Sequence, residues 1–426
     1  MLRLLHVSDI HFSNLLEGQP DLDLELAVRH RMLQDIGLMR QELGPMDGIL
    51  AVGDIANRGQ AEEFAKATDF LRNAAELIGC PPDKVVCVPG NHDVDRGVQD
   101  LTHDALRHQL RTIPPRELSD KLLALLRDPQ ASGPLFRPFA AYNEFALAYG
   151  CDISPQKPVY APKVFELGSR RLQVHGITSS WVSDGHDAHD SDAQRLVGGL
   201  FQLASIGQDP ETVSVTLCHH PPRWLRDAEE LKPWTVKAHL VLTGHEHEAG
   251  VQQSEDGRTL FIASGAVNPS RTEAGWIPAY NIIEIEWNDS QPEAIEVAVY
   301  ARSWQMGRAE FGPDDLSNEP ARFQLSLTHP PKGADPNQSM TTRTLTQETV
   351  VSIPAAEPIE SAAHTHAHTI MRAAPDWRRS EARAMGLLID DRLVGLDADR
   401  ALLNEALRTR RLSELAARLV GGSRHG

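Results

Sequence analysis

Short apolar runs alternate with longer helical patterns over the first 90 residues of the chain. The apolar runs predict three buried strands, at Leu2–Val7, Gly48–Val52 and Val85–Val88. Between them, Leu24–Leu43 and Ala61–Ile78 carry apolar residues at helical spacing. Strands that alternate with helices of this length are typical of βαβ units, so the pattern indicates an α/β fold with a largely parallel sheet.

The pattern changes after residue 93. Residues 94–160 are largely helical in pattern, above all Leu101–Tyr149, and predict an inserted cap beside the sheet. The last three expected strands, Leu260–Ala263, Tyr280–Trp287 and Ala294–Tyr300, are interpreted as an antiparallel set, which suggests a second sheet packed on the first. The predicted fold class is therefore an α/β two-sheet sandwich flanked by helices. The later strands are expected at Val164–Leu167, Leu172–Ile177, Val213–Leu217, Leu240–Leu242, Leu260–Ala263, Tyr280–Trp287 and Ala294–Tyr300.

A shift in composition near residue 330 divides the chain. Residues 1–329 form the main domain in this interpretation. Residues 330–375 are rich in Thr, Pro, Ala, Ser and Gln with little periodic apolar content, which predicts a flexible linker. Residues 376–426 regain helical periodicity and predict a small C-terminal helical module. This module is a candidate docking element for a protein partner; the alternative is a helical tail folded back onto the main domain.

Charge and cysteine content narrow the class of protein. The 426 residues include 42 Lys plus Arg against 59 Asp plus Glu, and the formal charge of -17 disfavours broad binding to duplex nucleic acid. The chain start lacks a signal-type apolar segment, and no run approaches 18 apolar residues, so we expect a cytoplasmic protein without a membrane span. The four cysteines show no CxxC pairing and predict buried thiols: Cys80, Cys87, Cys151 and Cys218.

Seven residues of metal-ligand type stand in five short motifs, each directly after an apolar run. Loops at the carboxyl ends of strands converge on one crevice in open α/β sheets, so these residues are expected to form one site. Two Asp, one Asn and four His are enough to surround two metal ions. They are Asp9 and His11 in HVSDIHF, Asp54 in AVGDIANRG, Asn91 in VPGNHDVDR, His219 in TLCHHPP, and His245 and His247 in LTGHEHE.

The spacing within these motifs suits a pair of divalent ions. Asp54 follows directly on a strand and a glycine and is the natural bridging carboxylate. Asp9 and His11 are two residues apart, so in extended conformation they lie on one face and can chelate one ion, and His245 and His247 repeat this spacing. Two such ions, about 3.5–4 Å apart, can clamp a phosphoryl group for in-line attack. Mn²⁺ is the first candidate, with Fe, Zn²⁺ and Mg²⁺ as alternatives.

Taken in order, the five motifs resemble the calcineurin-like metallophosphoesterase superfamily over roughly residues 1–300. The resemblance implies a metal-dependent phosphoester hydrolase with two metal ions. The HHPP motif leaves a choice of ligand between His219 and His220, and the family's frequent His-x-Pro pattern favours His219. The implied ligands are Asp9, His11, Asp54 and His247 for the first metal, and Asp54, Asn91, His219 and His245 for the second.

The resemblance also implies groups that act on the substrate. His92 becomes the non-ligand histidine that stabilises the transition state or protonates the leaving oxygen. Asp93 is then expected to orient the His92 imidazole. Arg58 matches a phosphate-contacting arginine of the protein phosphatases, and its alternative is a surface ion pair with Glu62 or Glu63.

Details of the motifs separate the branches of the superfamily. Protein Ser/Thr phosphatases carry GDxxDRG, where this chain has Asn57 in place of the second Asp, and they lack the GHEH pair. HHPP resembles the cyclic-nucleotide phosphodiesterase group. A phosphodiester, in a nucleotide or a nucleic acid, is therefore the expected substrate; a phosphomonoesterase is an alternative. VPGNHDVDR and SGAVNPSR resemble bacterial metallophosphoesterases found with partner proteins in defence settings, so an effector of such a multi-protein system is another alternative. A non-catalytic binding protein is disfavoured because the ligand sets are intact.

Other features carry weaker hypotheses. Asp184–Asp192 has the composition of a further metal loop, but a solvated loop is the better interpretation. The histidines of His364–His368 lie in the linker and are interpreted as incidental. Arg96, Asn268 and Arg271 stand near the motifs and are left open as groups that face the substrate.

Overall fold

The structure is a computed structural model that describes residues 1–13, 24–184, 187, 195–206, 209, 212–235, 237–269, 277–288, 290–314, 319–327 and 383–385. The chain divides into two compact units, Met1–Gly333 and Ala334–Gly426. The expected linker at 330–375 lies outside the described residues, as does the expected module at 376–426 apart from residues 383–385. Both assignments, and the docking role of the module, therefore stay predictions.

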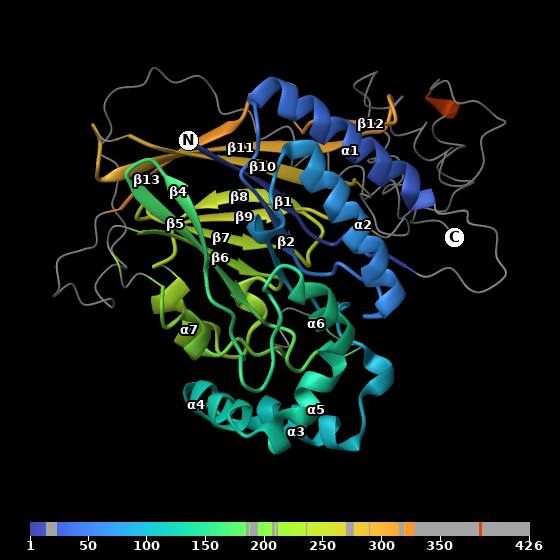
Figure 1. Cartoon of the computed structure of the whole chain (residues 1–426), viewed down its shortest axis with the longest axis vertical. Coiled ribbons are helices and arrows are strands. Elements are labelled where there is room, and N and C mark those ends of the chain that lie inside the picture. The colour runs from blue at the N-terminus through green and yellow to red at the C-terminus, as the bar shows by residue number, and fades with distance from the viewer. Residues whose placement is uncertain are drawn as a thin grey trace. The chain divides into compact units, whose positions relative to one another are not determined.

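The first sheet of unit Met1–Gly333 carries the N-terminal motifs (Figure 1). Its strand order is β12-β11-β10-β1-β2-β3, and β13 also pairs with β11. Strands β1, β2 and β3 are parallel, whereas β10 is antiparallel to β1. The strands are β1 (Leu2–Val7), β2 (Gly48–Val52), β3 (Val85–Val88), β10 (Ala279–Trp287), β11 (Ala294–Gln305), β12 (Glu310–Pro313) and β13 (Ala321–Ser326).

The second sheet carries the later motifs. Its order is β4-β5-β6-β7-β9-β8, with β5, β6, β7 and β9 parallel and an antiparallel strand at each edge. The strands are β4 (Lys163–Leu167), β5 (Arg170–Ile177), β6 (Thr212–Cys218), β7 (Leu240–Thr243), β8 (Ala249–Gln253) and β9 (Leu260–Ser264).

The two sheets pack face to face around one apolar core. Gly48 on β2 marks how close they come, because a Cβ there would lie 2.7 Å from the Phe165 ring of β4. Helices α1 (Leu24–Leu43) and α2 (Ala61–Ile78) lie side by side along the first sheet (Figure 1) and bury apolar residues in the same core. The two-sheet α/β sandwich flanked by helices is thereby confirmed.

The inserted region is helical, as the sequence predicts. It contains α3 (Leu101–Thr112), α4 (Pro115–Leu126), α5 (Pro129–Phe136) and α6 (Ala140–Leu147). In Figure 1, α3, α4 and α5 gather at one end of the sandwich, and α6 leads back towards α2. Arg111 of α3 ties this insert to the segment after β5. Its guanidinium donates to Asp184 at 2.6 Å, to Asp187 at 3.3 Å and to the carbonyl of Val182 at 2.9 Å. Helix α7 (Ala228–Thr235) follows β6.

One expectation about the sheets was wrong. The strands expected at Tyr280–Trp287 and Ala294–Tyr300 do not belong to a second sheet. Strand β10 pairs with β1 from Leu2↔Ile285 to His6↔Asn281, so these strands extend the first sheet. The apolar pattern of a strand indicates its buried face but not its partner, and three shorter strands, β8, β12 and β13, were missed.

All four cysteines are free and buried, as expected. No helix in the described part of the chain combines the length and the hydropathy of a membrane span.

Candidate metal centre and active site

The five motifs follow the carboxyl ends of β1, β2, β3, β6 and β7. The first two loops run side by side, since the backbone N–H of Asp9 donates to the carbonyl of Gly53 at 3.0 Å and that of His11 to Asp54 at 3.0 Å. From the second sheet, the N–H of Gly244 donates to the carbonyl of His219 at 2.9 Å. Parallel strands from two facing sheets thus bring residues more than 200 positions apart into one cluster.

The backbone at these strand ends is strained. Six non-glycine residues in the described part of the chain have positive φ, which is uncommon outside glycine, although Asn, Asp and His adopt it more often than other residues. Five of the six are expected metal ligands; the sixth is Ala309. Such strain persists where the surroundings enforce it and is concentrated at functional sites. The five are Asp9 (53°), His11 (51°), Asp54 (49°), His245 (70°) and His247 (58°).

Two glycines allow the loops to approach this closely. A Cβ on Gly53 would lie 2.5 Å from Nδ1 of His219, and a Cβ on Gly90 would collide with Oδ1 of Asp54. Both contacts are shorter than any real Cβ contact, so only glycine fits at either position. Gly53 and Gly90 directly precede Asp54 and Asn91, so the tight geometry of both loops depends on the absence of a side chain at these positions.

One half of the cluster is built around Asp9. Its Oδ1 lies 3.3 Å from Nε2 of His247 and 3.8 Å from Nε2 of His11. Nε2 of His11 also lies 3.9 Å from Oδ2 of Asp54. The other carboxylate oxygen of Asp9 accepts from the hydroxyl of Ser8 and from the N–H of His245 at 3.0 Å. Oδ1 is therefore the oxygen of Asp9 that faces the two imidazoles.

The other half is built around Oδ1 of Asn91. Three imidazole nitrogens face this oxygen: Nε2 of His219 at 3.3 Å, Nε2 of His220 at 3.2 Å and Nδ1 of His245 at 3.1 Å. Nε2 of His219 also lies 3.3 Å from Oδ2 of Asp54. His219 thus stands between Asp54 and Asn91, whereas His220 approaches Asn91 alone.

The donor set fits divalent cations. The Nδ1 atom of His219 lies 2.8 Å from the carbonyl of Val52, which can only accept, so Nδ1 carries a proton. In the neutral imidazole Nε2 then presents a lone pair to the oxygens of Asn91 and Asp54. These lone pairs repel one another, and a cation bound between the three atoms would remove this repulsion. The observed separations also agree with the roughly 3.0–3.4 Å expected between ligands that share one ion at about 2.1 Å.

Charged neighbours within the cluster shift the pKa values of its carboxylates and imidazoles. Burial alone would raise the pKa of Asp54, but the charges of His219 and His92 hold it well below its ordinary range. Burial would lower the pKa of His219, but the carboxylates of Asp54 and Asp9 raise it to about 9. Both shifts show that the carboxylates favour positive charge in this cluster.

Other imidazoles of the cluster are held neutral. Burial is the largest cause that lowers the pKa of His11 and of His245 to about 4. Burial and the neighbouring His245 hold the pKa of His220 well below its ordinary value. Neutral imidazole is the form that binds metal ions.

His92 lies at the exposed edge of the cluster, but Asp93 does not orient it. Nδ1 of His92 lies 2.8 Å from the backbone carbonyl of Asn57. The Asp93 carboxylate is turned away and accepts from the N–H groups of Ala56 at 2.7 Å and Gly90 at 2.8 Å. The expectation that Asp93 orients the imidazole is thus not met, because backbone donors of two loops occupy both of its oxygens.

Asp93 instead joins two of the motif loops. It is fully buried, and burial together with the nearby Asp54 charge raises its pKa to about 7. Its hydrogen bonds connect the loop of Asn91 with the loop of Asp54, so its influence on His92 passes through the backbone.

Arg58 is exposed beside the cluster, and the proposed pair with Glu63 is absent. The Glu63 carboxylate accepts from the backbone N–H groups of Arg58 at 2.8 Å and Gln60 at 3.2 Å, at the start of α2. Within the described part of the chain, the Arg58 guanidinium forms no ion pair. Arg96 donates to the carbonyl of Asn91 at 3.4 Å and so lies at the rim.

The remaining candidate residues of the sequence analysis have different positions in the structure. Asp184 and Asp187, from the candidate metal loop, both pair with Arg111, and Asp184 also pairs with Arg195 at 3.2 Å. The rest of 185–192 lies outside the described residues. The N–H of Asn268 donates to the carbonyl of Asp9 at 3.0 Å, and this places Asn268 beside the cluster. Arg271 and His364–His368 lie outside the described residues.

Sequence reasoning missed one supporting pair. Nε1 of Trp224 donates to Glu246 at 2.8 Å, and the Trp224 ring meets the His245 ring edge-on, with centroids 4.4 Å apart. Glu246 stands between two expected ligands in GHEH, and that position was the available signal.

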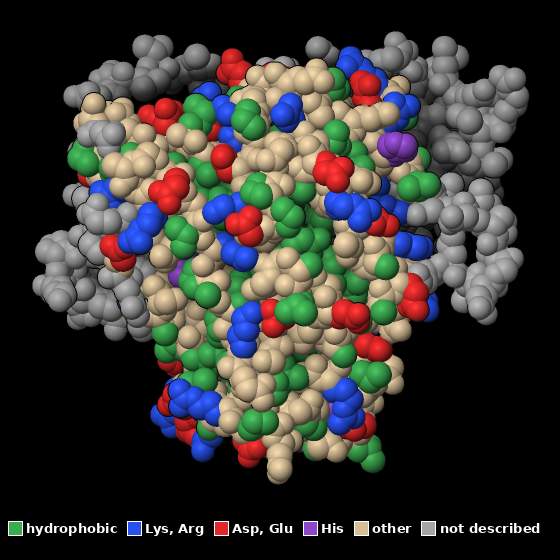
Figure 2. Space-filling view, in the orientation of Figure 1, with side chains coloured by type: hydrophobic (Ala, Val, Ile, Leu, Met, Phe, Trp, Pro, Cys, Tyr) green, Lys and Arg blue, Asp and Glu red, His purple; other side chains and the backbone are tan. Residues whose placement is uncertain are grey.

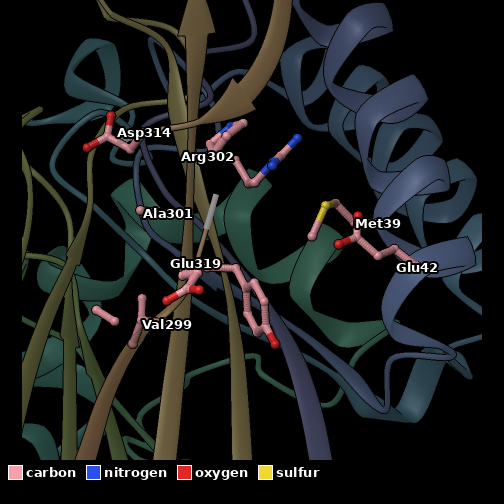
Figure 3. Close-up of a pocket in the computed structure, with 10 residues that line it drawn as sticks. Met39, Glu42, Val299, Ala301, Arg302, Asp314 and Glu319 are labelled. Carbon is pink, nitrogen blue, oxygen red and sulfur yellow. The ribbon is translucent and has the colours of Figure 1, made fainter. Parts of the chain in front are cut away.

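A separate cavity of about 200 Å³ lies between α1 and the strands β11 to β13 (Figure 3). Met39 and Glu42 line it from the helix and Arg302 from β11. Arg302 is held by Asp35 at 2.6 Å. None of the residues that line this cavity belongs to the five motifs, so it is distinct from the cluster.

The sandwich and its cluster of Asp, Asn and His define the metal-dependent phosphoesterase class of hydrolases. The model of the calcineurin-like phosphoesterase family matches residues 2–249, and the chain belongs to this family. The family implies a site for two divalent metal ions.

The three known proteins described next share low sequence identity with the chain. The chain is similar to the uncharacterized metallophosphoesterase-like protein YydB of Bacillus subtilis, at 25% identity over 281 residues that cover 62% of this chain and 53% of that protein. The chain thus spans about half the length of this relative. Among solved structures, it is similar to purple acid phosphatase PPD1 of yellow lupin, at 11% identity and a TM-score of 0.37, over 76% of this chain and 53% of that chain. A putative 5'-nucleotidase of Staphylococcus aureus gives 12% identity and a TM-score of 0.35, over 77% and 55%.

Proposed function

We propose that this protein hydrolyses a phosphodiester, in a nucleotide or a nucleic acid, with the help of two divalent metal ions. One observation carries the proposal: side chains from five separate strand ends meet in one cluster, with His92 at its exposed edge. Mn²⁺ is the first candidate ion. When bound, the two ions would supply Lewis-acid stabilisation of charge on the phosphoryl oxygens.

The residues divide into two ligand groups that share Asp54. The first group is supported by the contacts around Oδ1 of Asp9, and the second by the contacts around Oδ1 of Asn91. His219 is the assigned ligand of the HHPP motif because its Nε2 faces both Asp54 and Asn91. The proposed groups are Asp9, His11, Asp54 and His247, and Asp54, Asn91, His219 and His245.

His92 is proposed as the group that assists departure of the leaving oxygen. The Asn57 carbonyl keeps a proton on Nδ1, so Nε2 is the nitrogen left for the site. For protonation of the leaving oxygen, the imidazolium form is required, in which Nε2 carries the second proton and gives it to that oxygen. Arg58 is proposed to contact a phosphate oxygen, since its guanidinium is exposed and its neighbour Glu63 is engaged by backbone groups. Asp93 is proposed as a positioning residue that acts through the two loops it joins.

Surface charge bears on the class of substrate. In Figure 2, Lys and Arg side chains are interspersed with Asp and Glu over the described part of this face. No broad basic patch is visible among the described residues of this face, and the formal charge of -17 disfavours binding to a long duplex. We therefore propose that the substrate is a small nucleotide diester or a single-stranded nucleic-acid end in preference to a duplex. We also propose a cytoplasmic setting, which agrees with the free thiols.

The test is a substrate panel with purified full-length protein and Mn²⁺. It compares bis-p-nitrophenyl phosphate, p-nitrophenyl phosphate, cyclic mononucleotides, and single- and double-stranded DNA and RNA. We expect hydrolysis of a diester in preference to the monoester, and loss of turnover in Asn91→Ala. A clear preference for p-nitrophenyl phosphate would replace the proposal with a phosphomonoesterase. Full activity of Asn91→Ala would contradict the site itself.

A further inference from the structure

His220, the second histidine of HHPP, is fully buried against the cluster. Its Nδ1 lies 2.7 Å from the hydroxyl of Ser179, which is also fully buried, and its Nε2 lies 3.2 Å from Oδ1 of Asn91. The ring stands 4.4 Å from the ring of His245, centroid to centroid. None of the roles proposed above uses His220 or Ser179.

The two histidines of the motif are held by different kinds of partner. His219 faces the Val52 carbonyl, which only accepts, so Nδ1 carries a proton and, in the neutral imidazole that binds a metal ion, Nε2 has the lone pair. His220 faces a hydroxyl, which can donate. The Ser179 oxygen already accepts the backbone N–H of His220 at 3.4 Å, so the hydroxyl proton is free to go to Nδ1.

A neutral imidazole that accepts at Nδ1 carries its proton on Nε2. Oδ1 of Asn91 can only accept, so this proton completes a hydrogen bond at the observed 3.2 Å. A carbonyl oxygen has two lone pairs, and one hydrogen bond leaves the other for a cation. The hydrogen bond also fixes which end of the Asn91 amide faces the cluster.

We propose that Ser179 and His220 form a relay that positions Asn91: the Ser179 hydroxyl donates to His220, and His220 donates to Oδ1 of Asn91. His220 is then a positioning residue and His219 the ligand. Asp54, Asn91, His219 and His245 already offer four donor atoms, so the second ion does not need His220. The inference rests on the metal centre of the proposed function, but not on the choice of substrate.

The experiment is calorimetric titration of Mn²⁺ into metal-free, full-length protein. Partners that orient a ligand change metal affinity by about 10- to 100-fold when they are removed. We therefore expect Ser179→Ala and His220→Ala to bind two ions per chain, with the affinity of one of the two sites, the one assigned to Asn91, reduced by that factor. Ser179→Thr keeps the hydroxyl, and His220→Gln keeps an N–H donor, so both are expected to recover most of the affinity.

His219→Ala is the matched control for the loss of a true ligand, and it is expected to bind one ion. If His220→Ala also bound only one ion, His220 would be a ligand and the relay would be overturned. Wild-type affinity in Ser179→Ala would overturn it as well. Circular dichroism of each metal-free variant checks the fold; should His220→Ala fail to fold, the two Ser179 variants decide.

The titration contains no substrate, so its outcome is independent of catalysis. If the wild-type protein binds two ions and the relay variants weaken one, the inference holds even where no phosphoester on the panel is hydrolysed. In the converse case, activity on the panel with unchanged Mn²⁺ binding in Ser179→Ala would support the proposed function and refute the relay.

Discussion

The backbone carbonyl of Asn57 lies 2.8 Å from Nδ1 of His92 and is the group that orients this imidazole. A carbonyl cannot donate, so the contact is a hydrogen bond only when Nδ1 carries the proton. It therefore sets the tautomer without a side-chain acid. The Asn57 side chain replaces an Asp of the protein phosphatase pattern, and it is the backbone carbonyl of Asn57 that contacts His92.

Replacement of His92 by Gln is expected to lower kcat by about 10²- to 10⁴-fold, the usual contribution of a positioned acid or base. Metal binding should stay at the wild-type stoichiometry, because His92 is not among the proposed ligands. Steady-state kinetics and calorimetry with Mn²⁺ measure the two effects. His108→Gln, at an exposed position of α3, is the control. Wild-type kcat in His92→Gln would remove His92 from the mechanism.

Replacement of Arg58 by Ala is expected to reduce kcat/KM by roughly 10- to 100-fold, since a charge-assisted hydrogen bond to phosphate contributes about 1.5–3 kcal/mol. Arg58→Lys should recover part of this loss, because lysine keeps the charge but not the forked geometry. Kinetics on the best substrate of the panel measure both variants. Equal activity of Arg58→Ala and the wild type would show that the guanidinium points into solvent without a catalytic role.

Replacement of Arg111 by Met is expected to lower the free energy of unfolding by about 1.5–3 kcal/mol, because it removes charge-assisted hydrogen bonds to the buried carboxylates of Asp184 and Asp187, while Arg195 still pairs with Asp184 at 3.2 Å. Chemical denaturation measures the change. Arg72→Met breaks an exposed pair with Asp69 and should cost less than about 1 kcal/mol. Similar losses in the two variants would mean that the hydrogen bonds of Arg111 between α3 and the segment after β5 add little to the free energy of unfolding.

His175 is expected to make stability depend on pH. Burial lowers its pKa from 6.5 to about 4, so the folded state binds its proton less readily than the unfolded state. This contribution is complete above pH 6.5 and is lost as the pH falls from 6.5 towards 4. Between pH 7.5 and 5 the wild type should lose about 2 kcal/mol relative to His175→Gln. Denaturation of both proteins at the two pH values measures this; an unchanged difference would show that His175 does not titrate in this range.

The sequence by itself determined the elements and the chemistry of the centre. The bounds expected for β1, β2, β3, α1 and α2 are those observed, because each has a clear local period and ends at a glycine, a proline or a polar motif. The seven ligand-type residues also follow from local pattern: each stands directly after a buried strand, and parallel strands bring such positions together.

Only the tertiary structure determined which hydrogen-bond partners the side chains of the site have. Asp93 follows His92 in sequence, yet its oxygens are taken by backbone N–H groups of Ala56 and Gly90. His219 and His220 are adjacent in the sequence, but the imidazole of His219 faces the Val52 carbonyl and that of His220 faces the Ser179 hydroxyl. The physical reason is the same in each case. Local periodicity sets which residues form a strand and which face is buried, whereas hydrogen-bond partners depend on groups that other strands deliver.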